Sequence, residues 1–440
     1  MKKRFRIITP FLRFFETESA SGIILIIVTL FALLIANSPL YPHYHHFFET
    51  PIKFSYDNFE IKNTTHHWIN DGLMTIFFLL VGLEIKREIA YGELSSIKKS
   101  LVPVVAAVGG MIVPSLIFTY FNIGLPTIKG WAIPTATDIA FSLGILSLMG
   151  RRAPYALKVF LATLAIVDDL LAIIVIAVFY TATINLNALV LSSIFTGILA
   201  FFSLLKIRNI LPYIIVGFFL WLFLLQSGVH STLTGVIIAF LLPIKSRINY
   251  EQFYNKSLGI VNSLKKITES TESTKEIEYQ YKSSIQSLEQ ICEAVQSPSE
   301  RLEHSIQNWV AFFIVPIFAF ANSGLVINTE TLTQLGNPVS LGIILGLLVG
   351  KPLGIISFSY AMQFLGLGKI SKDIHFQQFL GMGFLCGIGF TVAIFVSELA
   401  YKTSPEYIDN AKAAILLGST LATLVGIIIF RITPKPKRAS

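Results

Sequence analysis

The sequence predicts an all-α integral membrane protein of about twelve transmembrane helices, with a small β-hairpin outside the membrane. Composition is the first reason: of 440 residues, 53% are hydrophobic and only 14% are charged, and the mean hydropathy is +0.68. The second reason is spacing, because apolar runs of roughly 15 to 25 residues alternate with short polar breaks, and about 20 apolar residues form a helix that crosses a bilayer. The third reason is the distribution of lysine and arginine, which occupy alternate breaks.

Each apolar run is expected to be a helix, because a helix satisfies its own backbone hydrogen bonds in lipid. The runs begin near Gly22, Gly72, Val102, Trp131, Leu157, Leu189, Ile210, Val229, Trp309, Val339, Phe379 and Ala413. Basic residues follow the even-numbered runs, so the positive-inside rule places both termini in the cytoplasm. The net charge of +8 is distributed by loop and forms no single patch, so it does not indicate a nucleic-acid partner.

Two loops are more than connectors. The segment "PIKFSYDNFEIKN", residues 51–63, alternates apolar and polar residues on both sides of Asp57-Asn58, which is the pattern of a β-hairpin. Residues 245–303 form the one long polar stretch and are interpreted as a cytoplasmic, partly helical insertion. It separates spans 1–8 (residues 1–244) from spans 9–12 (residues 304–440). An amphipathic helix packed on a neighbour is predicted there from apolar residues at steps of three and four, namely Ile277, Tyr281, Ile285, Leu288, Cys292 and Val295.

Two spans carry signals that interrupt a helix. In the fourth, "WAIPTATDIAFSLG" contains Pro134, which removes a backbone donor, and Thr135 and Thr137, which can bond the freed carbonyl groups. In the eleventh, "GMGFLCGIGFT" is dense in glycine, which weakens a helix. These are the middle spans of the triplets 3–5 and 10–12. Interrupted segments at matching positions indicate a transporter built from inverted repeats with a binding site at mid-membrane.

The fifth span, "LATLAIVDDLLAIIVIAVFY", places Asp168 and Asp169 side by side among apolar residues. An ionisable residue at this depth costs at least about 2.5 kcal/mol on insertion scales, so it is expected to face the protein interior or a water-filled cavity. Neighbours on a helix point about 100° apart. One aspartate would then face an ion cavity and the other a counter-charge, for which Lys351 in "LGLLVGKPLGIISF" is the candidate. Lys351 would either carry a proton or only neutralise a carboxylate.

Two carboxylates near a water-filled cavity hold hard cations through oxygen, and protonation destroys that capacity. Burial and mutual repulsion favour the protonated form of such groups. The same pair therefore binds either a cation or protons, and this competition is the minimum that an exchanger requires.

At these residues the chain resembles a known family. The segments "GWAIPTATDIAFSLG", "LAIVDDLLAIIVIA", "INDGLMTIFFLLVGLEIKRE", "SGVHSTLTGV", "RLEHSIQNWVAFFIVPIFAFANSG" and "CGIGFTVAIFVSELA" are similar to the NhaA family of sodium/proton antiporters over nearly the whole length. The resemblance implies that interrupted helices 4 and 11 cross and that a homodimer is aided by the hairpin. It also implies electrogenic exchange of Na⁺ or Li⁺ for H⁺ across a bacterial inner membrane, activated at alkaline pH.

The resemblance also assigns roles. It implies that Asp168 and Asp169 bind Na⁺, that Thr137 and Asp138 lie at the helix crossing, and that Lys351 pairs with Asp168. It places a pH-responsive cytoplasmic cluster at Glu84, Arg87, Glu303 and His304, and a position that tunes the pH profile at His230. Two features depart from the family pattern: the insertion at residues 245–303, and Gln307 where a second histidine is expected.

Two other functions compete with this reading. A sodium-coupled symporter of an organic solute would need a larger polar or aromatic-lined cavity. An intramembrane aspartyl protease would use two deep aspartates, such as Asp138 and Asp168, but its usual "GxGD" element is missing from the sequence. The few deep polar groups favour transport of a bare ion, with no enzymatic activity and no cofactor.

Overall fold

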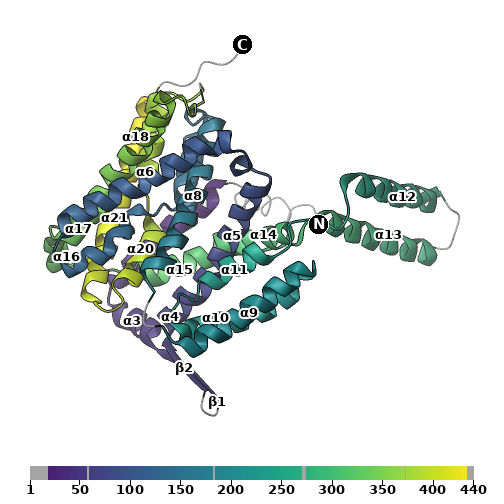
Figure 1. The fold of residues 1–440 in the computed structure, drawn as a ribbon, viewed down its shortest axis with the longest axis horizontal. Coiled ribbons are helices and arrows are strands. Elements are labelled where there is room, and N and C mark those ends of the chain that lie inside the picture. Colours follow the sequence, from purple (N-terminus) through teal and green to yellow (C-terminus); the bar gives the residue numbers. More distant parts are fainter. Residues whose placement is uncertain (1–17, 57–58, 182–183, 270–273, 372, 434–440) are drawn as a thin grey trace.

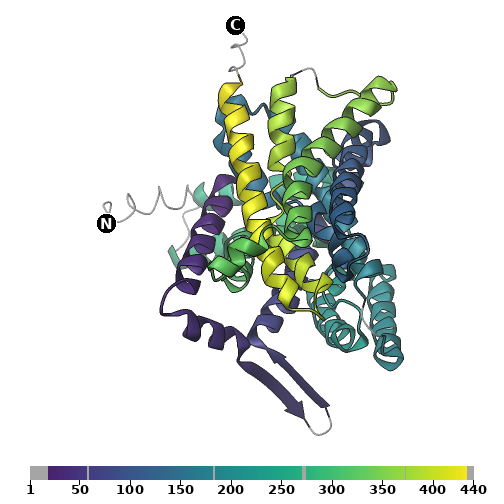
Figure 2. The same cartoon turned by 90° about the vertical axis from the view of Figure 1, so that its left-hand side faces the viewer.

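The computed structural model describes residues 18–56, 59–181, 184–269, 274–371 and 373–433. It is a bundle of helices from which two elements project, a two-stranded β-hairpin and a pair of helices that we call the arm (Figure 1). Figure 2 shows the hairpin at one end of the bundle, with the last turn of the C-terminal helix at the opposite end.

Nine helices of the described chain are long and apolar enough to cross a membrane, and up to eleven spans result if each of two bent pairs counts as one. This confirms the predicted all-α, multi-span membrane class. The uninterrupted spans are α6 (Ile97–Asn122), α8 (Tyr155–Phe179), α9 (Leu186–Leu204), α10 (Ile210–Ser227) and α21 (Glu406–Ile432). Three spans contain a π-helical turn: α4 (Thr65–Trp68), η1 (Ile69–Leu73) and α5 (Met74–Ala90); α14 (Pro298–Trp309), η5 (Val310–Ile314) and α15 (Val315–Asn322); and α17 (Pro338–Leu345), η6 (Gly346–Gly350) and α18 (Lys351–Phe364).

The interruptions predicted in spans 4 and 11 are present. Span 4 is a 3₁₀ segment, η3 (Pro126–Thr135), followed by extended backbone and then α7 (Ile139–Leu148). Span 11 is α19 (Phe376–Leu385) followed by α20 (Phe390–Ala400), and the two are bent by 43°. The other bent pair is α2 (Glu18–Ala36) and α3 (Tyr41–Glu49), which turns by 108° after the first span.

The eighth span is shorter than the sequence predicts. The apolar run from Val229 begins with a turn, and the helix α11 covers only Leu233–Leu241. Gly228 ends α10 with φ +84, a conformation that glycine adopts without strain. At the other end, the Lys86 ammonium donates to the carbonyl of Phe240 at 2.7 Å and to that of Leu242. These bonds satisfy carbonyl groups that have no partner inside the helix.

The hairpin consists of β1 (Pro51–Tyr56) and β2 (Phe59–Thr64), paired antiparallel with Pro51 opposite Thr64. The expected turn at Asp57-Asn58 lies outside the described residues. The arm consists of α12 (Tyr250–Glu269) and α13 (Thr274–Val295). The predicted packed face of α13 is confirmed only in part: Tyr281, Leu288 and Val295 are partly buried, whereas Ile285 and Cys292 are exposed. The side chain of Ile277 lies outside the described residues. A step pattern of three and four fits several overlapping faces of one helix, so it left the packed face ambiguous.

Three short elements complete the chain. They are the 3₁₀ turns η2 (Glu93–Ser95) and η4 (Gly150–Arg152) and the helix α16 (Thr329–Gln334). The core is built around spans 3, 4, 5, 10 and 11. Within it, α6 and α18 approach so closely that a Cβ placed on Gly354 would lie 2.1 Å from the Gly109 carbonyl oxygen. Glycine at both positions therefore permits the close packing of α6 against α18, the helix that begins at Lys351.

Candidate functional site

The site is built where the two interrupted spans cross. Between η3 and α7 the backbone is extended, so the regular hydrogen bonding of a helix is interrupted there. Polar groups of this segment bond to the break in span 11: the Asp138 N–H donates to the Ile388 carbonyl at 2.7 Å, and the Thr137 hydroxyl lies 3.0 Å from the Cys386 carbonyl oxygen. Each break thus satisfies the other, which is how irregular backbone is tolerated at membrane depth.

Asp138 lies between the N-termini of two half-helices. Its Oδ1 accepts the Phe141 N–H at 3.0 Å and thereby caps α7. Its Oδ2 accepts the Thr391 hydroxyl at 2.6 Å and the Thr391 N–H at 3.3 Å in the first turn of α20. Helix N-termini carry partial positive charge. One buried carboxylate therefore compensates two of them, and Thr391 is a contact that the sequence reasoning missed.

Asp168 and Lys351 form a buried ion pair. The Lys351 ammonium lies 2.6 Å from Asp168 Oδ2, and the two side chains are 0% and 2% exposed. The same oxygen lies 2.8 Å from the Thr137 hydroxyl. A π-helical turn positions the lysine, because the Lys351 N–H bonds to the Gly346 carbonyl five residues earlier. The pairing that the family resemblance implied is the one that the geometry contains.

Asp169 differs from its neighbour. It is 2% exposed, and its Oδ2 has no hydrogen-bond partner in the part of the chain that the structure describes. The acidic side chains that act on it electrostatically are Asp168, Glu84 and Asp138. A buried, unsatisfied carboxylate oxygen among other carboxylates is a poor structural element, since leaving it without a partner costs about 1–3 kcal/mol or more. It is well suited to hold a proton or a small cation.

The residues expected in a cytoplasmic cluster are partly brought together. Arg87 on α5 forms an ion pair with Glu303 on α14 and lies 3.3 Å from Glu88. Glu84, one turn before Glu88, interacts electrostatically with both Arg87 and Glu303. His304, the next residue on α14, is exposed and acts electrostatically on Glu303, which is buried. The sequence reasoning missed Glu88, which its spacing of four residues from Glu84 on one helix could have indicated.

His230 lies in the turn between α10 and α11, outside both helices. Its Nε2 is 2.7 Å from the Tyr180 carbonyl oxygen. A carbonyl only accepts, so Nε2 carries the proton in the neutral ring. Burial lowers the pKa of His230, while the Tyr180 carbonyl and the Asp71 carboxylate oppose that shift and Lys402 adds to it. Burial therefore favours the neutral form of this histidine, and the Tyr180 carbonyl orients its ring.

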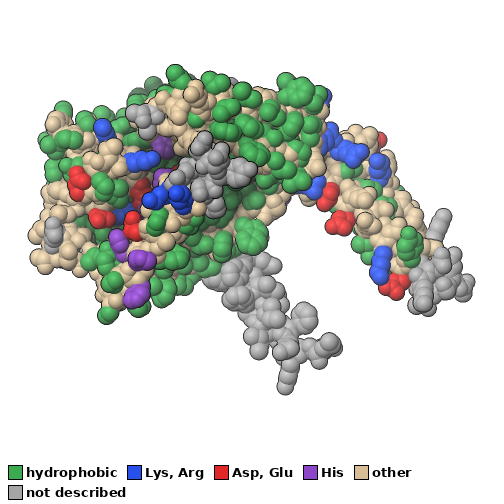
Figure 3. Space-filling model, turned by 90° about the horizontal axis from the view of Figure 1, so that it is seen from below, with side chains coloured by type: hydrophobic (Ala, Val, Ile, Leu, Met, Phe, Trp, Pro, Cys, Tyr) green, Lys and Arg blue, Asp and Glu red, His purple; other side chains and the backbone are tan. Residues whose placement is uncertain are grey.

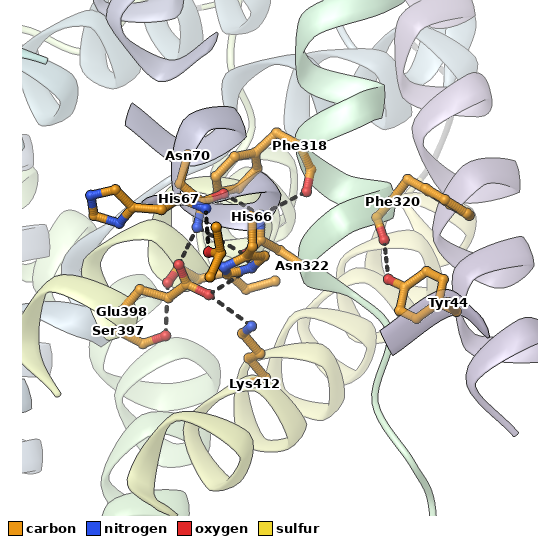
Figure 4. A network of polar contacts seen from close by, with 12 residues as sticks. Tyr44, His66, His67, Asn70, Phe318, Phe320, Asn322, Ser397, Glu398 and Lys412 are labelled. Carbon is orange, nitrogen blue, oxygen red and sulfur yellow. Dashed lines mark hydrogen bonds and ion pairs between the residues drawn. The ribbon is translucent and has the colours of Figure 1, made fainter. Parts of the chain in front are cut away.

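A second polar network lies on the hairpin side of the bundle (Figure 4). Glu398 on α20 is 2.8 Å from the Lys412 ammonium on α21 and 3.4 Å from His66 Nε2 on α4. It also accepts the Asn70 amide, and Asn70 exchanges hydrogen bonds with Asn322 at the end of α15. These residues thus join spans 2 and 9 to spans 11 and 12.

This network lines a cavity of about 900 Å³ that also includes Asp71, Tyr180 and His230. Figure 3 shows charged and histidine side chains gathered on this side of the molecule, with hydrophobic side chains over much of the remaining surface. Asp71 and Glu398 lie near the ends of their apolar runs in the sequence. The sequence gave no signal that Lys412 and His66 meet Glu398, or that Asn322 contacts His66.

Comparisons with known proteins find similar sequences over nearly the whole chain. A sequence model of the family described as "Na+/H+ antiporter 1" matches residues 12–430. The chain is 44% identical to "Na(+)/H(+) antiporter NhaA 1" of Saccharophagus degradans, over 97% of this chain and 92% of that protein. It is 42% identical to "Na(+)/H(+) antiporter NhaA" of Sulfurimonas denitrificans, over 98% and 97% respectively. The identity is also 42% to "Na(+)/H(+) antiporter NhaA" of Escherichia coli O139:H28, over 96% and 98%.

Proposed function

Because the chain belongs to the Na⁺/H⁺ antiporter family, we propose that it is a secondary antiporter that exchanges cytoplasmic Na⁺ or Li⁺ for external protons. Membership of this family argues against the symporter and the aspartyl protease. The observation that carries the proposal is the buried Asp168–Lys351 ion pair beside the unsatisfied Oδ2 of Asp169. No third group is needed for the exchange, because protons and Na⁺ compete for the same carboxylate oxygens.

The exchange follows from charge balance at this pair. With protons bound, Asp169 is neutral and Lys351 compensates Asp168. A cation arriving from the cytoplasm displaces the proton from Asp169, with Asp168 and Asp169 as its oxygen ligands. The added positive charge weakens the attraction between Asp168 and Lys351. An electrogenic cycle results when more protons than cations are exchanged per turnover. Thr137 and Asp138 hold the crossing in place during these events.

Regulation by pH fits the cytoplasmic cluster. Glu84, Glu88 and Glu303 share the single guanidinium of Arg87, so loss of a proton adds charge that one cation must balance. We assign activation at alkaline pH to this cluster, with His304 at its exposed edge and His230 tuning the profile from the hairpin side. Gln307 in place of a second histidine predicts a set point different from that of relatives with the histidine.

The proposal also includes the setting of the molecule. The distribution of lysine and arginine supports a bacterial inner membrane protein with both termini in the cytoplasm, which puts the hairpin and the cavity of about 900 Å³ on the external side. The two-stranded hairpin has free edges that pair readily with another strand, so we assign it a role in a homodimer. Residues 245–303 form an accessory cytoplasmic insertion between the regions 1–244 and 304–440.

Everted membrane vesicles test this function directly. After acidification of the vesicle interior, added Na⁺ or Li⁺ should make a pH-sensitive dye report alkalinisation, because only exchange couples cation entry to proton exit. Asp168→Asn and Asp169→Asn should each abolish the response at normal expression, while exposed Asp373→Asn should leave it intact. A normal response in either site variant would refute the assignment.

A further inference from the structure

The arm carries apolar side chains on two faces of each helix. One face of α12, with Phe253, Ile260 and Leu264, is partly buried towards α13. Other apolar residues of the arm are largely exposed: Tyr250 by 86%, Tyr254 by 64%, Leu258 by 45%, Val261 by 51% and Ile285 by 57%. Cys292 is exposed as well. The first four recur at steps of four and three residues, so they form one stripe along α12.

These exposed residues of both helices lie on the same side of the arm, whereas Tyr279 of α13, exposed by 75%, lies on another side. Successive residues of a helix are rotated by about 100° about its axis. Viewed along the chain direction, the exposed stripe of α12 is rotated by about 100° from the face that packs on α13. Ile285 and Cys292 are rotated by a similar angle, in the same sense, from the packed face of α13. The two helices run antiparallel and face each other. Equal rotations from their packed faces, each taken along its own chain direction, therefore bring the stripe of α12 and the Ile285 side of α13 to the same side of the arm. The Arg247 N–H donates to the Ala294 carbonyl at 2.9 Å, so the start of α12 lies beside the end of α13. Counting along the two helices from this bond places Leu258 at about the same height as Ile285.

We propose that this side of the arm, formed by Tyr250, Tyr254, Leu258, Val261, Ile285 and Cys292, is a self-association surface that binds the same surface of a second copy of this chain. The inference concerns a segment outside the exchange site and does not depend on the proposed function. We call this surface the arm face.

Area supports a second copy as the occupant. From the exposed fractions above, the arm face offers roughly 600 Å² of mostly apolar surface, so two copies would bury about 1,200 Å² in total, the lower bound for a specific protein interface. A two-fold contact between identical faces buries most area when their centres meet. Leu258 and Ile285 then lie next to the two-fold axis, with Tyr250 and Cys292 at the ends.

Charge argues against the bilayer as the occupant. Residues 250–295 contain five basic and seven acidic residues, a net charge of −2, although the whole chain carries +8. A cytoplasmic membrane surface is negatively charged and attracts basic segments. Figure 3 shows both signs of charge along the arm, and Lys282 is already paired with Glu278 at 2.7 Å. Apolar side chains flanked by charges of both signs suit a protein surface.

Site-directed cross-linking of the full-length protein in native membranes tests the proposal. In a Cys292→Ser background, where Cys386 is buried, Leu258→Cys should give a covalent dimer with a short bis-maleimide. The exposed Ser263→Cys on the opposite side of α12 should not. Native Cys292 alone should also cross-link poorly, because a pairing centred on Leu258 keeps the two ends apart.

A matched pair of charge substitutions distinguishes specific pairing of two arm faces from cross-linking by random collision of two copies. Tyr254→Glu on the arm face should reduce the Leu258→Cys dimer several-fold, while the neighbouring Asn255→Glu, which is exposed on another side, should not. Equal cross-linking of Ser263→Cys would overturn the proposal. A Leu258→Cys adduct that forms only with another protein would also overturn it. The same holds if no adduct forms and brominated lipid quenches a fluorescent probe attached at Leu258→Cys, because the arm face would then contact the bilayer. None of these readouts requires transport activity.

Discussion

Lys351 and Asp168 offer the sharpest energetic prediction. Both side chains are buried, at 0% and 2% exposure, and their charged atoms are 2.6 Å apart. Replacing Lys351 by Met leaves the Asp168 charge without its partner, and breaking a buried pair in this way costs about 3–5 kcal/mol. Asp168→Asn leaves the ammonium unpaired at a similar cost. The double variant has neither charge, so its loss should be smaller than the sum by about 2–3 kcal/mol.

Thermal unfolding of the purified protein in detergent measures this coupling. The exposed pair Lys282–Glu278, at 74% and 66% exposure, is a matched control. An i,i+4 ion pair in water contributes only about 0.3–0.5 kcal/mol, so the Lys282→Met and Glu278→Gln variants should show almost no coupling. Additive losses at Lys351 and Asp168 would refute the view that the two charges stabilise each other.

The same lysine is predicted to move a proton. When Na⁺ occupies the aspartates, the attraction that keeps Lys351 protonated is partly cancelled, so the lysine releases a proton in addition to the one displaced from Asp169. Lys351→Gln should then retain some exchange but carry fewer protons per Na⁺. The reversal potential of the variant in liposomes measures that ratio, and a value identical to that of the parent protein would rule out proton transfer by Lys351.

Four further outcomes are expected. Thr391→Val removes the 2.6 Å bond to Asp138 and should lower stability by about 1–3 kcal/mol and impair transport, whereas the exposed Thr420→Val, which loses only a bond to its own helix, should do neither in the same assays. Replacing residues 250–295 by a flexible linker should leave the vesicle transport rate nearly unchanged, provided that Ser297 and Glu300 keep their capping box at the start of α14. Burial lowers the pKa of His230, so the folded state disfavours its proton and stability should fall as pH drops below the unfolded value of about 6.5; His230→Gln should show a smaller loss between pH 7.5 and 5.5 in thermal unfolding. Glu398→Gln removes the partner of Lys412 and should loosen the hairpin side, making the buried, cavity-lining Ser231→Cys react faster with an impermeant thiol reagent; an unchanged rate would contradict this.

Local chemistry explains which parts of the fold were predictable. Pro134 and the glycines of span 11 act on their own helices, so their sequence predicts the interruptions. The short α11 was missed because the apolar run was taken to begin at Val229. The segment "SGVHSTLTGV" holds only three strongly apolar residues, Val229, Leu233 and Val236, and the break depends on the conformation of Gly228. The arm was predicted as helical, but the packed face of α13 was predicted only in part, since several apolar faces overlap in this helix.

The site was predictable in its residues but not in its partners. A carboxylate inside an apolar run can be recognised from the sequence alone, so Asp138, Asp168 and Asp169 were found. Thr391 was not, because threonine is common in apolar spans and becomes informative only when α20 begins beside Asp138. Lys412 and His66 lie near span ends, where charged residues are ordinary, and their meeting at Glu398 depends on the packing of distant spans.

The helix crossing and the Glu398 network are held together by different kinds of contact. This difference affects how the ion site could change from facing one side of the membrane to facing the other. At the crossing, the breaks of spans 4 and 11 are joined through backbone groups, as in the bond from Asp138 to Ile388. Separating them would leave buried peptide groups unpaired, at about 1–3 kcal/mol or more each. On the hairpin side, spans 2 and 9 meet spans 11 and 12 through side chains that line a cavity of about 900 Å³. If Glu398, Lys412 and His66 separate, water in that cavity can replace the lost contacts. A change of access is therefore expected to open the Glu398 network and to move the crossing as one unit, which is why the Ser231→Cys measurement follows the hairpin side rather than the aspartate pair.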